Sequence, residues 1–396
     1  MSAPVPGGGP LSGIRVVELA AQGPVPFAAM LLADLGAEVI RIDRTVPRDG
    51  MRTAPLRGRR SIAIDLSQPR GAELGRALIA GADVVVEGFR PGVMERLGLG
   101  PTQFEASNPG LVYGRMTGWG QDGPLSRRAG HDINYLALSG LLWAIGRPPD
   151  RPVPPLNLVG DYGGGAMFLV VGVLAALLER VRSGRGQVID AAMTDGIAAL
   201  STPLHSLRAS GGWSDARGTN FLDTGAANYE VYECADGQFV AVGALEPAFY
   251  RALIDGLALH CPEWPGAAAE RGAGAPSEGS AQRLADAFHR RTRDEWTAAF
   301  EATDACVVGV LSPAEAPHHP HHRARGTYLD VDGVVQAAPA PRFSRTPGRP
   351  REPTTRLGGH TTEVLAELGH TAAEVTALIA ERIVSAAQLP VRPSED

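Results

Sequence analysis

The sequence predicts an α/β fold, with an open parallel sheet in a Rossmann-like large domain and a smaller α+β domain after it. Apolar strand-like runs alternate with helix-like segments over the first half of the chain, which indicates a parallel sheet covered by helices. Near residue 218 the pattern changes to a hairpin followed by helices. We therefore expect a large domain, a linker, a small domain, and a return segment whose C-terminal helices pack on the large domain: residues 1–200, 201–224, 225–325 and 326–396.

The beginning of the chain predicts a βαβ unit. Residues 14–19 are apolar enough for a buried strand, and a helix is expected over residues 26–35 with Gly36 as its C-terminal cap. Residues 37–43 form the next strand, and a right-handed crossover makes the two strands parallel. The alternation continues with strands at 61–66, 82–87, 111–117 and 187–192 and helices at 71–80 and 162–180.

The second half predicts a different domain. Residues 229–232 and 239–242 indicate a hairpin around the turn Asp236-Gly237. Residues 266–279 are rich in alanine and glycine, so we expect a loose surface loop there. Helices are expected at 250–257, 282–289, 294–300, 361–368 and 372–387.

The composition is that of an ordinary soluble globular protein. Its 396 residues are 44% hydrophobic and 20% charged, and the formal charge is −6, so a nucleic-acid partner is not expected. Lysine is absent and all 37 basic residues are arginine, which excludes a lysine Schiff base and a Walker-type phosphate site. The glycine fingerprint of dinucleotide folds is missing after the first strand, so nicotinamide and flavin cofactors are not expected.

The N-terminus, the apolar runs and the cysteines bear on the cellular compartment in which the protein is expected. The N-terminus lacks the layout of a signal peptide, and the longest apolar run, 13 residues at 166–178, is too short to cross a bilayer. The three cysteines match neither a zinc pattern nor a disulfide framework. We expect a cytoplasmic protein without a membrane partner.

Three ionisable residues stand among turn-forming or helix-starting residues. His131 is a candidate general base because histidine is the residue type suited to proton transfer near neutral pH, although a structural loop histidine is the alternative. Asp161 is expected to cap a helix that starts at Tyr162, either as an ordinary cap or as a base or nucleophile. The three glycines after Tyr162 would let an anion approach bare backbone N–H groups there. Glu246 follows a predicted strand, where a solvated carboxylate is the alternative.

Arginines gather at the strand ends and turns where a parallel sheet binds its ligands. They are candidate phosphate contacts, with Phe89 as an aromatic surface for stacking a base. These arginines are Arg44, Arg57, Arg59, Arg60, Arg90 and Arg96. The run His318-His319-Pro320-His321-His322 has no cysteine or convincing carboxylate partner nearby, so a solvated loop is favoured over zinc and no metal is expected.

Six longer motifs follow one another along the chain: PLSGIRVVEL at 10–19, FRPG at 89–92, RMTGWGQ at 115–121, RPVPPLN at 151–157, TDAC at 303–306 and PAPRFSR at 339–345. Through these motifs, residues 10–350 resemble the family III CoA-transferases and, within that superfamily, the α-methylacyl-CoA racemases. The resemblance implies racemisation or epimerisation of 2-methyl-branched acyl-CoA thioesters. An α-proton would be abstracted and returned through an enolate.

The resemblance also implies an assembly and a site. It implies an interlocked homodimer, with His131 and Asp161 from one chain and Glu246 from the other, where Glu246 hydrogen-bonds the histidine. The CoA part of the substrate would lie along these residues, the last two near its pantetheine and thioester: Arg44, Ile64, Gly88, Phe89, Arg90, Arg96, Gly130 and Tyr135. Proton transfer between two bases requires no metal or redox cofactor.

Two other functions remain open. A family III CoA-transferase would use Asp161 as the nucleophile that forms an acyl anhydride. A non-catalytic acyl-CoA-binding protein would keep the arginines but would not need all three ionisable groups. His131 and Glu246 favour the racemase, because a transferase needs no second base. Phe27 and Asn228 depart from the family pattern and bear on the acyl pocket.

Overall fold

The computed structural model describes residues 8–46, 57–264, 266–273, 275–331, 333–350, 356–386 and 389–390. They form two compact units. Unit 1 contains the described residues of Met1–Ser139, Leu156–Ser201 and Gly326–Asp396, and unit 2 those of Gly140–Pro155 and Thr202–Arg325. Residues 140–155, which the sequence assigned to the large domain, and residues 202–224 of the expected linker belong to unit 2.

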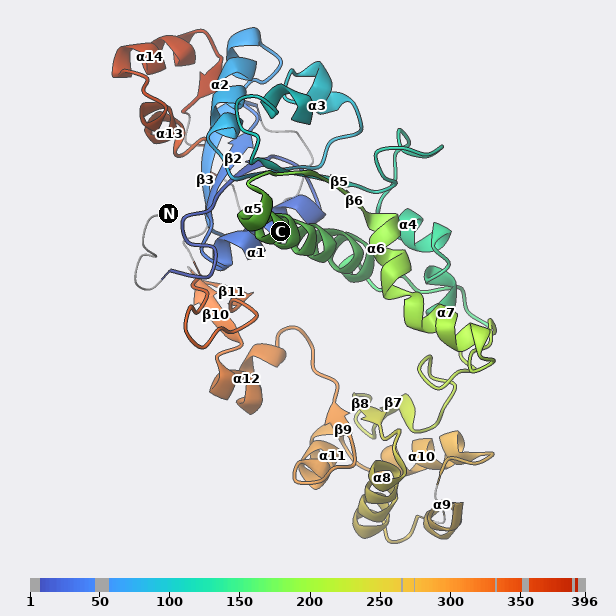
Figure 1. The fold of residues 1–396 in the computed structure, drawn as a ribbon. Helices are drawn as coiled ribbons and strands as arrows, with labels where there is room; N and C mark the ends of the chain where they lie inside the picture. The colour runs from blue at the N-terminus through green and yellow to red at the C-terminus, as the bar shows by residue number, and fades with distance from the viewer. Residues whose placement is uncertain are drawn as a thin grey trace. The chain divides into compact units, whose positions relative to one another are not determined.

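Unit 1 is built on a seven-stranded sheet with the order β13-β3-β2-β1-β4-β5-β6. All neighbouring strands are parallel except β13, which runs antiparallel to β3 at the sheet edge. This confirms the predicted α/β fold with a parallel sheet (Figure 1). The strands are β1 (Arg15–Leu19), β2 (Glu38–Asp43), β3 (Arg59–Ile64), β4 (Val84–Glu87), β5 (Val112–Thr117), β6 (Val188–Ala192) and β13 (Val384–Ser385).

Helices and short pairs of strands complete unit 1. The helices are α1 (Pro24–Asp34), α2 (Pro69–Ala80), α3 (Val93–Arg96), η1 (Pro101–Phe104), α4 (Asp132–Leu138), the π-helical segment η3 (Leu158–Met167), α5 (Phe168–Ser183), α6 (Met193–Leu200), α13 (Thr361–Glu367) and α14 (Ala372–Ala380). The short strands are β10 (Tyr328–Val331), β11 (Val334–Ala337), β12 (Arg356–Leu357) and β14 (Leu389–Pro390).

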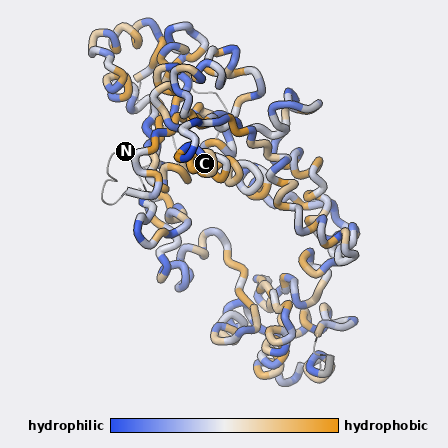
Figure 2. The backbone as a smooth tube through the Cα atoms, viewed as in Figure 1, coloured by the Kyte–Doolittle hydropathy of each residue, from blue (hydrophilic) through white to orange (hydrophobic). Residues whose placement is uncertain are grey.

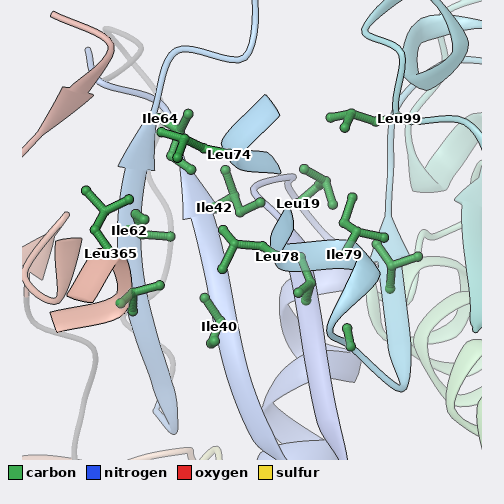
Figure 3. Packing of buried hydrophobic residues seen from close by; sticks show 14 of the residues in the cluster. Leu19, Ile40, Ile42, Ile62, Ile64, Leu74, Leu78, Ile79, Leu99 and Leu365 are labelled. Atoms are coloured by element: carbon green, nitrogen blue, oxygen red, sulfur yellow. The ribbon is translucent and has the colours of Figure 1, made fainter. Parts of the chain in front are cut away.

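The C-terminal helices share the core of unit 1. Ile62 and Ile64 of β3 lie beside Leu365 of α13, and Leu74 and Leu78 of α2 pack on the same sheet face (Figure 3). The helix expected over residues 372–387 ends earlier, at Ala380, because the chain then extends into β13. Ending the helix there lets the chain cover the backbone groups of an edge strand that would otherwise stay unpaired.

Unit 2 has a three-stranded antiparallel sheet in the order β7-β8-β9. The predicted hairpin is confirmed, and large aromatic residues such as Trp296 and Phe288 fill the core. The elements are η2 (Leu142–Ala144), α7 (Thr202–Ala209), β7 (Tyr229–Glu233), β8 (Phe239–Gly243), α8 (Pro247–His260), α9 (Ala267–Ala273), α10 (Ser280–Phe288), α11 (Arg293–Phe300), β9 (Val307–Gly309), η4 (Ala316–His318) and α12 (Pro320–Arg325).

The expectation of a loose loop at residues 266–279 is wrong. The segment contains α9, and its Glu270 is fully buried. The carboxylate accepts hydrogen bonds from Tyr250 and Ser280 and pairs with Arg283. A buried carboxylate with this many donors orders the segment, and the alanine and glycine content does not reveal those donors.

The helix formed by η3 and α5 is longer than the apolar run within it. It covers the 26 residues Leu158–Ser183, and its most apolar stretch of 18 residues has a mean hydropathy of 1.8 (Figure 2). Among the described residues, this one helix is long and apolar enough to cross a bilayer, a test that core helices of globular proteins also pass. Leu169 and Val173 pack inside unit 1, whereas Val171 and Leu178 are exposed.

Candidate functional site

A cavity of about 1230 Å³ opens at the carboxyl ends of the parallel strands, and all of its lining residues belong to unit 1. The segments that follow β1, β2, β3, β4 and β5 contribute to its wall. The strand order reverses between β1 and β4, and ligands of open α/β sheets bind at such a point. The cavity therefore lies where this topology places a ligand site.

Most of the predicted site residues lie around this one cavity. They are Arg44, Ile64, Gly88, Phe89, Arg90, Gly130, His131, Tyr135 and Asp161. Arg96 is not among the lining residues; it ends α3, is exposed, and directs its guanidinium toward Gly92. Glu246 belongs to unit 2.

His131 stands immediately before α4 and is its N-cap residue, with an extended backbone. Its backbone N–H donates a 3.0 Å hydrogen bond to Oδ1 of Asn134, and its backbone oxygen accepts from the N–H of the same residue. These two bonds hold the backbone of the histidine at the helix start. The imidazole is exposed and lines the cavity, so it is free to act on a ligand.

Asp161 is not the helix cap that the sequence predicted. Helical backbone begins earlier, at Leu158, so Asp161 lies in the first turn of η3. Its Oδ2 accepts a 3.1 Å hydrogen bond from Nδ2 of Asn157. Burial raises the pKa of Asp161, the Asn157 bond opposes this, and the charge of Asp132 adds to it. The carboxyl group therefore retains a proton at higher pH than a solvated aspartate does.

The glycines after Asp161 serve helix packing, which corrects their expected role as a ligand approach. A Cβ on Gly196 of α6 would lie 1.8 Å from the backbone oxygen of Gly164, and one on Gly164 would lie 2.9 Å from the backbone nitrogen of Ile197. Only hydrogen side chains permit this backbone separation. The glycines bring η3 and α6 together and thereby fix the position of Asp161.

Tyr135 forms part of the wall of the cavity that the two candidate bases also line. Its ring lies so close to Gly118 that a Cβ there would come within 2.1 Å of it, and it meets Trp119 edge to face at 4.7 Å. Burial, with a further contribution from the charge of Asp161, raises the pKa of Tyr135 to about 12. Its hydroxyl therefore stays neutral over the physiological range.

Three exposed arginines line the cavity: Arg44, Arg90 and Arg128. None of them forms an ion pair with another residue in the described part of the chain. Phe89 stands beside Arg90 in the same wall. Guanidinium groups with free donors next to an aromatic ring suit a ligand that carries phosphates and a base.

The other predicted phosphate contacts have partners within the protein. Arg57 is buried and forms a bidentate ion pair with Asp34, in which two guanidinium nitrogens donate to the two carboxylate oxygens over 2.8 and 2.7 Å. Arg59 donates to Glu18 over 2.5 Å, also in the interior. The partners of Arg60 are Glu38, Glu363 and Glu367. Arg57 and Arg60 thus have partners within the protein and do not line the cavity, which differs from their predicted role as ligand contacts, whereas Arg59 is paired and also lines the cavity.

Glu87 and its partners support the turn that carries Gly88 and Phe89, and sequence reasoning missed them. Oε2 of Glu87 accepts a 2.7 Å hydrogen bond from the N–H of Phe89, and Nε of Arg115 donates to Oε1 over 3.1 Å. Burial raises the pKa of Glu87 to about 7, although both donors favour the charged form. An acidic residue at the end of a buried strand was the signal available in the sequence.

Two residues that depart from the family pattern have different surroundings. Phe27 lines the cavity beside Tyr162, with ring centroids 4.6 Å apart, next to Asp161. Asn228 is buried in unit 2 and donates a 2.8 Å hydrogen bond to the backbone oxygen of Ala244. It therefore braces the loop that carries Glu246, which is the exposed N-cap residue of α8.

The histidines at residues 318–322 lie at η4 and α12 rather than in an irregular loop. In the part of the chain that the structure describes, no group of three histidine, cysteine, aspartate or glutamate side chains is arranged to hold a metal ion.

The chain matches the family model described as CoA-transferase family III over residues 11–361. A mouse protein named alpha-methylacyl-CoA racemase is 46% identical, with 96% of this chain and 98% of that protein covered. The human protein of the same name is 45% identical, with coverage of 94% and 97%. A solved CAIB/BAIF family protein from Brucella suis shares the fold with a TM-score of 0.76 and 27% identity, over 91% of this chain and 100% of that one.

Proposed function

We propose, starting from the fact that this chain belongs to CoA-transferase family III, that it racemises 2-methyl-branched acyl-CoA thioesters. This reaction is the one named for the mouse and human relatives, which are alpha-methylacyl-CoA racemases. The observation that carries the proposal is that His131 and Asp161 line one cavity together with unpaired arginines. An imidazole and a carboxyl group of raised pKa are the two proton carriers that such a reaction needs.

The proposed step moves one proton on each face of the α-carbon. His131 accepts the α-hydrogen from one face, and the C–H electron pair moves into the enolate of the thioester. Protonated Asp161 then donates its proton to the opposite face, and the new C–H bond inverts the configuration. The reverse reaction exchanges the two roles. Carbon undergoes no net oxidation or reduction, so the proposed step needs no metal or redox cofactor.

We assign the CoA moiety to the arginine-lined part of the cavity. Arg44 and Arg90 have free guanidinium donors for its phosphates, and the ring of Phe89 offers a surface for the adenine. The pantetheine would extend past Gly130 and Tyr135 toward the two bases. The acyl chain would then meet Phe27, the cavity residue that departs from the family pattern.

We further propose that the protein is a homodimer and that Glu246 of the partner subunit supports His131. The exposed face of the helix formed by η3 and α5 carries large apolar side chains at Met167 of η3 and at Val171, Leu178 and Val181 of α5, and their spacing places them on one stripe. Exposed apolar stripes of this length mark interaction surfaces. A second copy that covers the stripe would remove it from water.

The test uses one enantiomer of a 2-methylacyl-CoA in deuterium oxide, without any acceptor acid. The proposal expects deuterium at the α-carbon together with loss of optical activity. Tight binding without exchange or transfer would instead show a non-catalytic acyl-CoA-binding protein.

The second candidate is a CoA-transferase, which the matched family model favours. Asp161 would attack the thioester carbonyl and form an acyl anhydride while CoA leaves as the thiolate. This reading expects no reaction until a free carboxylic acid is added, followed by exchange of CoA between the two acids. The same assay therefore separates the two activities.

A further inference from the structure

Asp132 links the two residues that we propose as bases. It directly follows His131, as the first residue of α4, and it is 8% exposed. Its Oδ1 accepts a 2.7 Å hydrogen bond from the backbone N–H of Asp161, a residue 29 positions further along the chain. One side chain thus ties the segment of one base to the backbone of the other.

The approach of the two segments depends on Gly160. A Cβ at this position would lie 2.2 Å from Oδ1 and 2.7 Å from Cγ of Asp132. Any larger side chain would push the Asp132 carboxylate away from η3. The glycine therefore permits the contact between α4 and the turn that carries Asp161.

The remaining oxygen of Asp132 does not contribute to the fold through hydrogen bonds. Oδ2 is buried and has no hydrogen-bond partner among the described residues. Burial raises the pKa of Asp132, while the backbone N–H groups of Asp161 and Gly160 lower it. A buried carboxylate oxygen without a partner costs free energy, so the role of Asp132 is not explained by stability alone.

We propose that Asp132 is a positioning residue that holds Asp161 opposite His131, so that a proton taken on one face of the α-carbon is matched by delivery on the other. The inference rests on the proposed racemase reaction. The Asp132 side chain is not among the lining residues of the cavity. It acts by fixing the distance between the two proton carriers.

The experiment compares inversion with α-deuterium exchange for the enantiomer whose α-hydrogen faces His131. If Asp161 is displaced, His131 still removes the proton and returns deuterium to its own face. Inversion, which needs delivery by Asp161, then falls more than exchange does. A variant that merely contains less folded protein loses both rates by the same factor.

The variants are Asp132→Ala and Gly160→Ala, which break the contact by different means, and Asp132→Asn, which keeps an acceptor oxygen. We expect the first two to lower inversion on the order of 10-fold or more relative to exchange, since small displacements of catalytic groups are costly. We expect Asp132→Asn to retain the wild-type ratio of inversion to exchange. Matched controls are Asp83→Ala, which removes an acceptor of the Arg15 N–H, and Gly81→Ala, where a Cβ meets nothing closer than 3.7 Å.

An unchanged ratio of inversion to exchange in both contact-breaking variants would overturn the inference. If Asp132→Ala does not fold, Gly160→Ala decides the matter with the intact Asp132 side chain. A wild-type protein that neither exchanges nor inverts would instead refute the proposed function. The two failures therefore give different results.

Discussion

Nδ2 of Asn157 donates a 3.1 Å hydrogen bond to Oδ2 of Asp161. The bond stabilises the charged carboxylate and lowers the pKa of Asp161, against the effect of burial. Asn157→Ala should therefore raise that pKa. In the direction in which Asp161 accepts the proton it must be ionised, so the acid limb of kcat/KM should move to higher pH.

Rate profiles against pH in both directions measure this effect. Asn108→Ala is the control, because that amide bonds the backbone oxygens of Ala80 and Ala82 at 3.1 and 2.7 Å and does not line the cavity. An acid limb that moves equally in both variants, or in neither, would contradict the role of Asn157.

The two bases should show opposite preferences when each is removed. Asp161→Asn should lower inversion by roughly 10²–10⁴-fold while one enantiomer still exchanges its α-hydrogen through His131. His131→Ala should preserve exchange only in the enantiomer whose α-hydrogen faces Asp161, because Asp161 can still remove that hydrogen. Proton NMR in deuterium oxide follows both reactions, and loss of all exchange in both variants would argue against two independent bases.

Arg44 and Arg90 should contribute to binding rather than to the chemical step. Each alanine variant loses a cation in the arginine-lined wall, so KM for the acyl-CoA should rise roughly 10- to 100-fold, as for one charge-assisted hydrogen bond of about 1.5–3 kcal/mol, with little change in kcat. Steady-state kinetics at two salt concentrations test this. Arg185→Ala is a suitable control, since Arg185 is exposed and does not line the cavity.

The buried pair of Arg57 and Asp34 should affect stability and leave the chemistry intact. Both side chains are 2% exposed, so removing one leaves an unpaired charge in the interior. Arg57→Ala should lower the free energy of unfolding by about 3–5 kcal/mol. Urea denaturation measures the loss, and replacing both residues by apolar ones should recover part of it. An unaltered unfolding midpoint for Arg57→Ala would show that the pair does not support the fold.

If the active site combines His131 of one subunit with Glu246 of the partner subunit, dimers of two different variants should behave differently from either variant alone. Co-expressed His131→Ala and Glu246→Ala chains should regain activity, because one site of the mixed dimer then has both side chains intact. Each variant alone should show little inversion. If both side chains act within one chain, every mixed site lacks one of them and activity does not return.

Strands β1, β4 and β5 of unit 1 were predictable because they are short apolar runs that are almost wholly buried. The predicted strand at 14–19 corresponds to β1 (Arg15–Leu19), and that at 111–117 to β5 (Val112–Thr117). Strand β13 was not predictable, because its pairing with β3 joins residues more than 300 positions apart. Helix α9 was missed for a similar reason, since the donors that order Glu270 come from other helices.

The sequence by itself determined the parallel α/β architecture and the identity of His131 and Asp161 as candidate proton carriers. Local apolar patterns are sufficient for the architecture and residue chemistry for naming the two candidates, whereas their roles in racemisation are implied by the resemblance to the family. Only the tertiary structure decided which arginines remain free for a ligand, since Arg57 and Arg44 look alike until the partner Asp34 is placed. It also decided how Asp161 is held, because the bond from Asn157 needs the helical backbone of η3 and the bond to Asp132 exists only once η3 and α4 meet. A hydrogen bond or ion pair depends on distances between segments, and a residue pattern along one chain does not contain them.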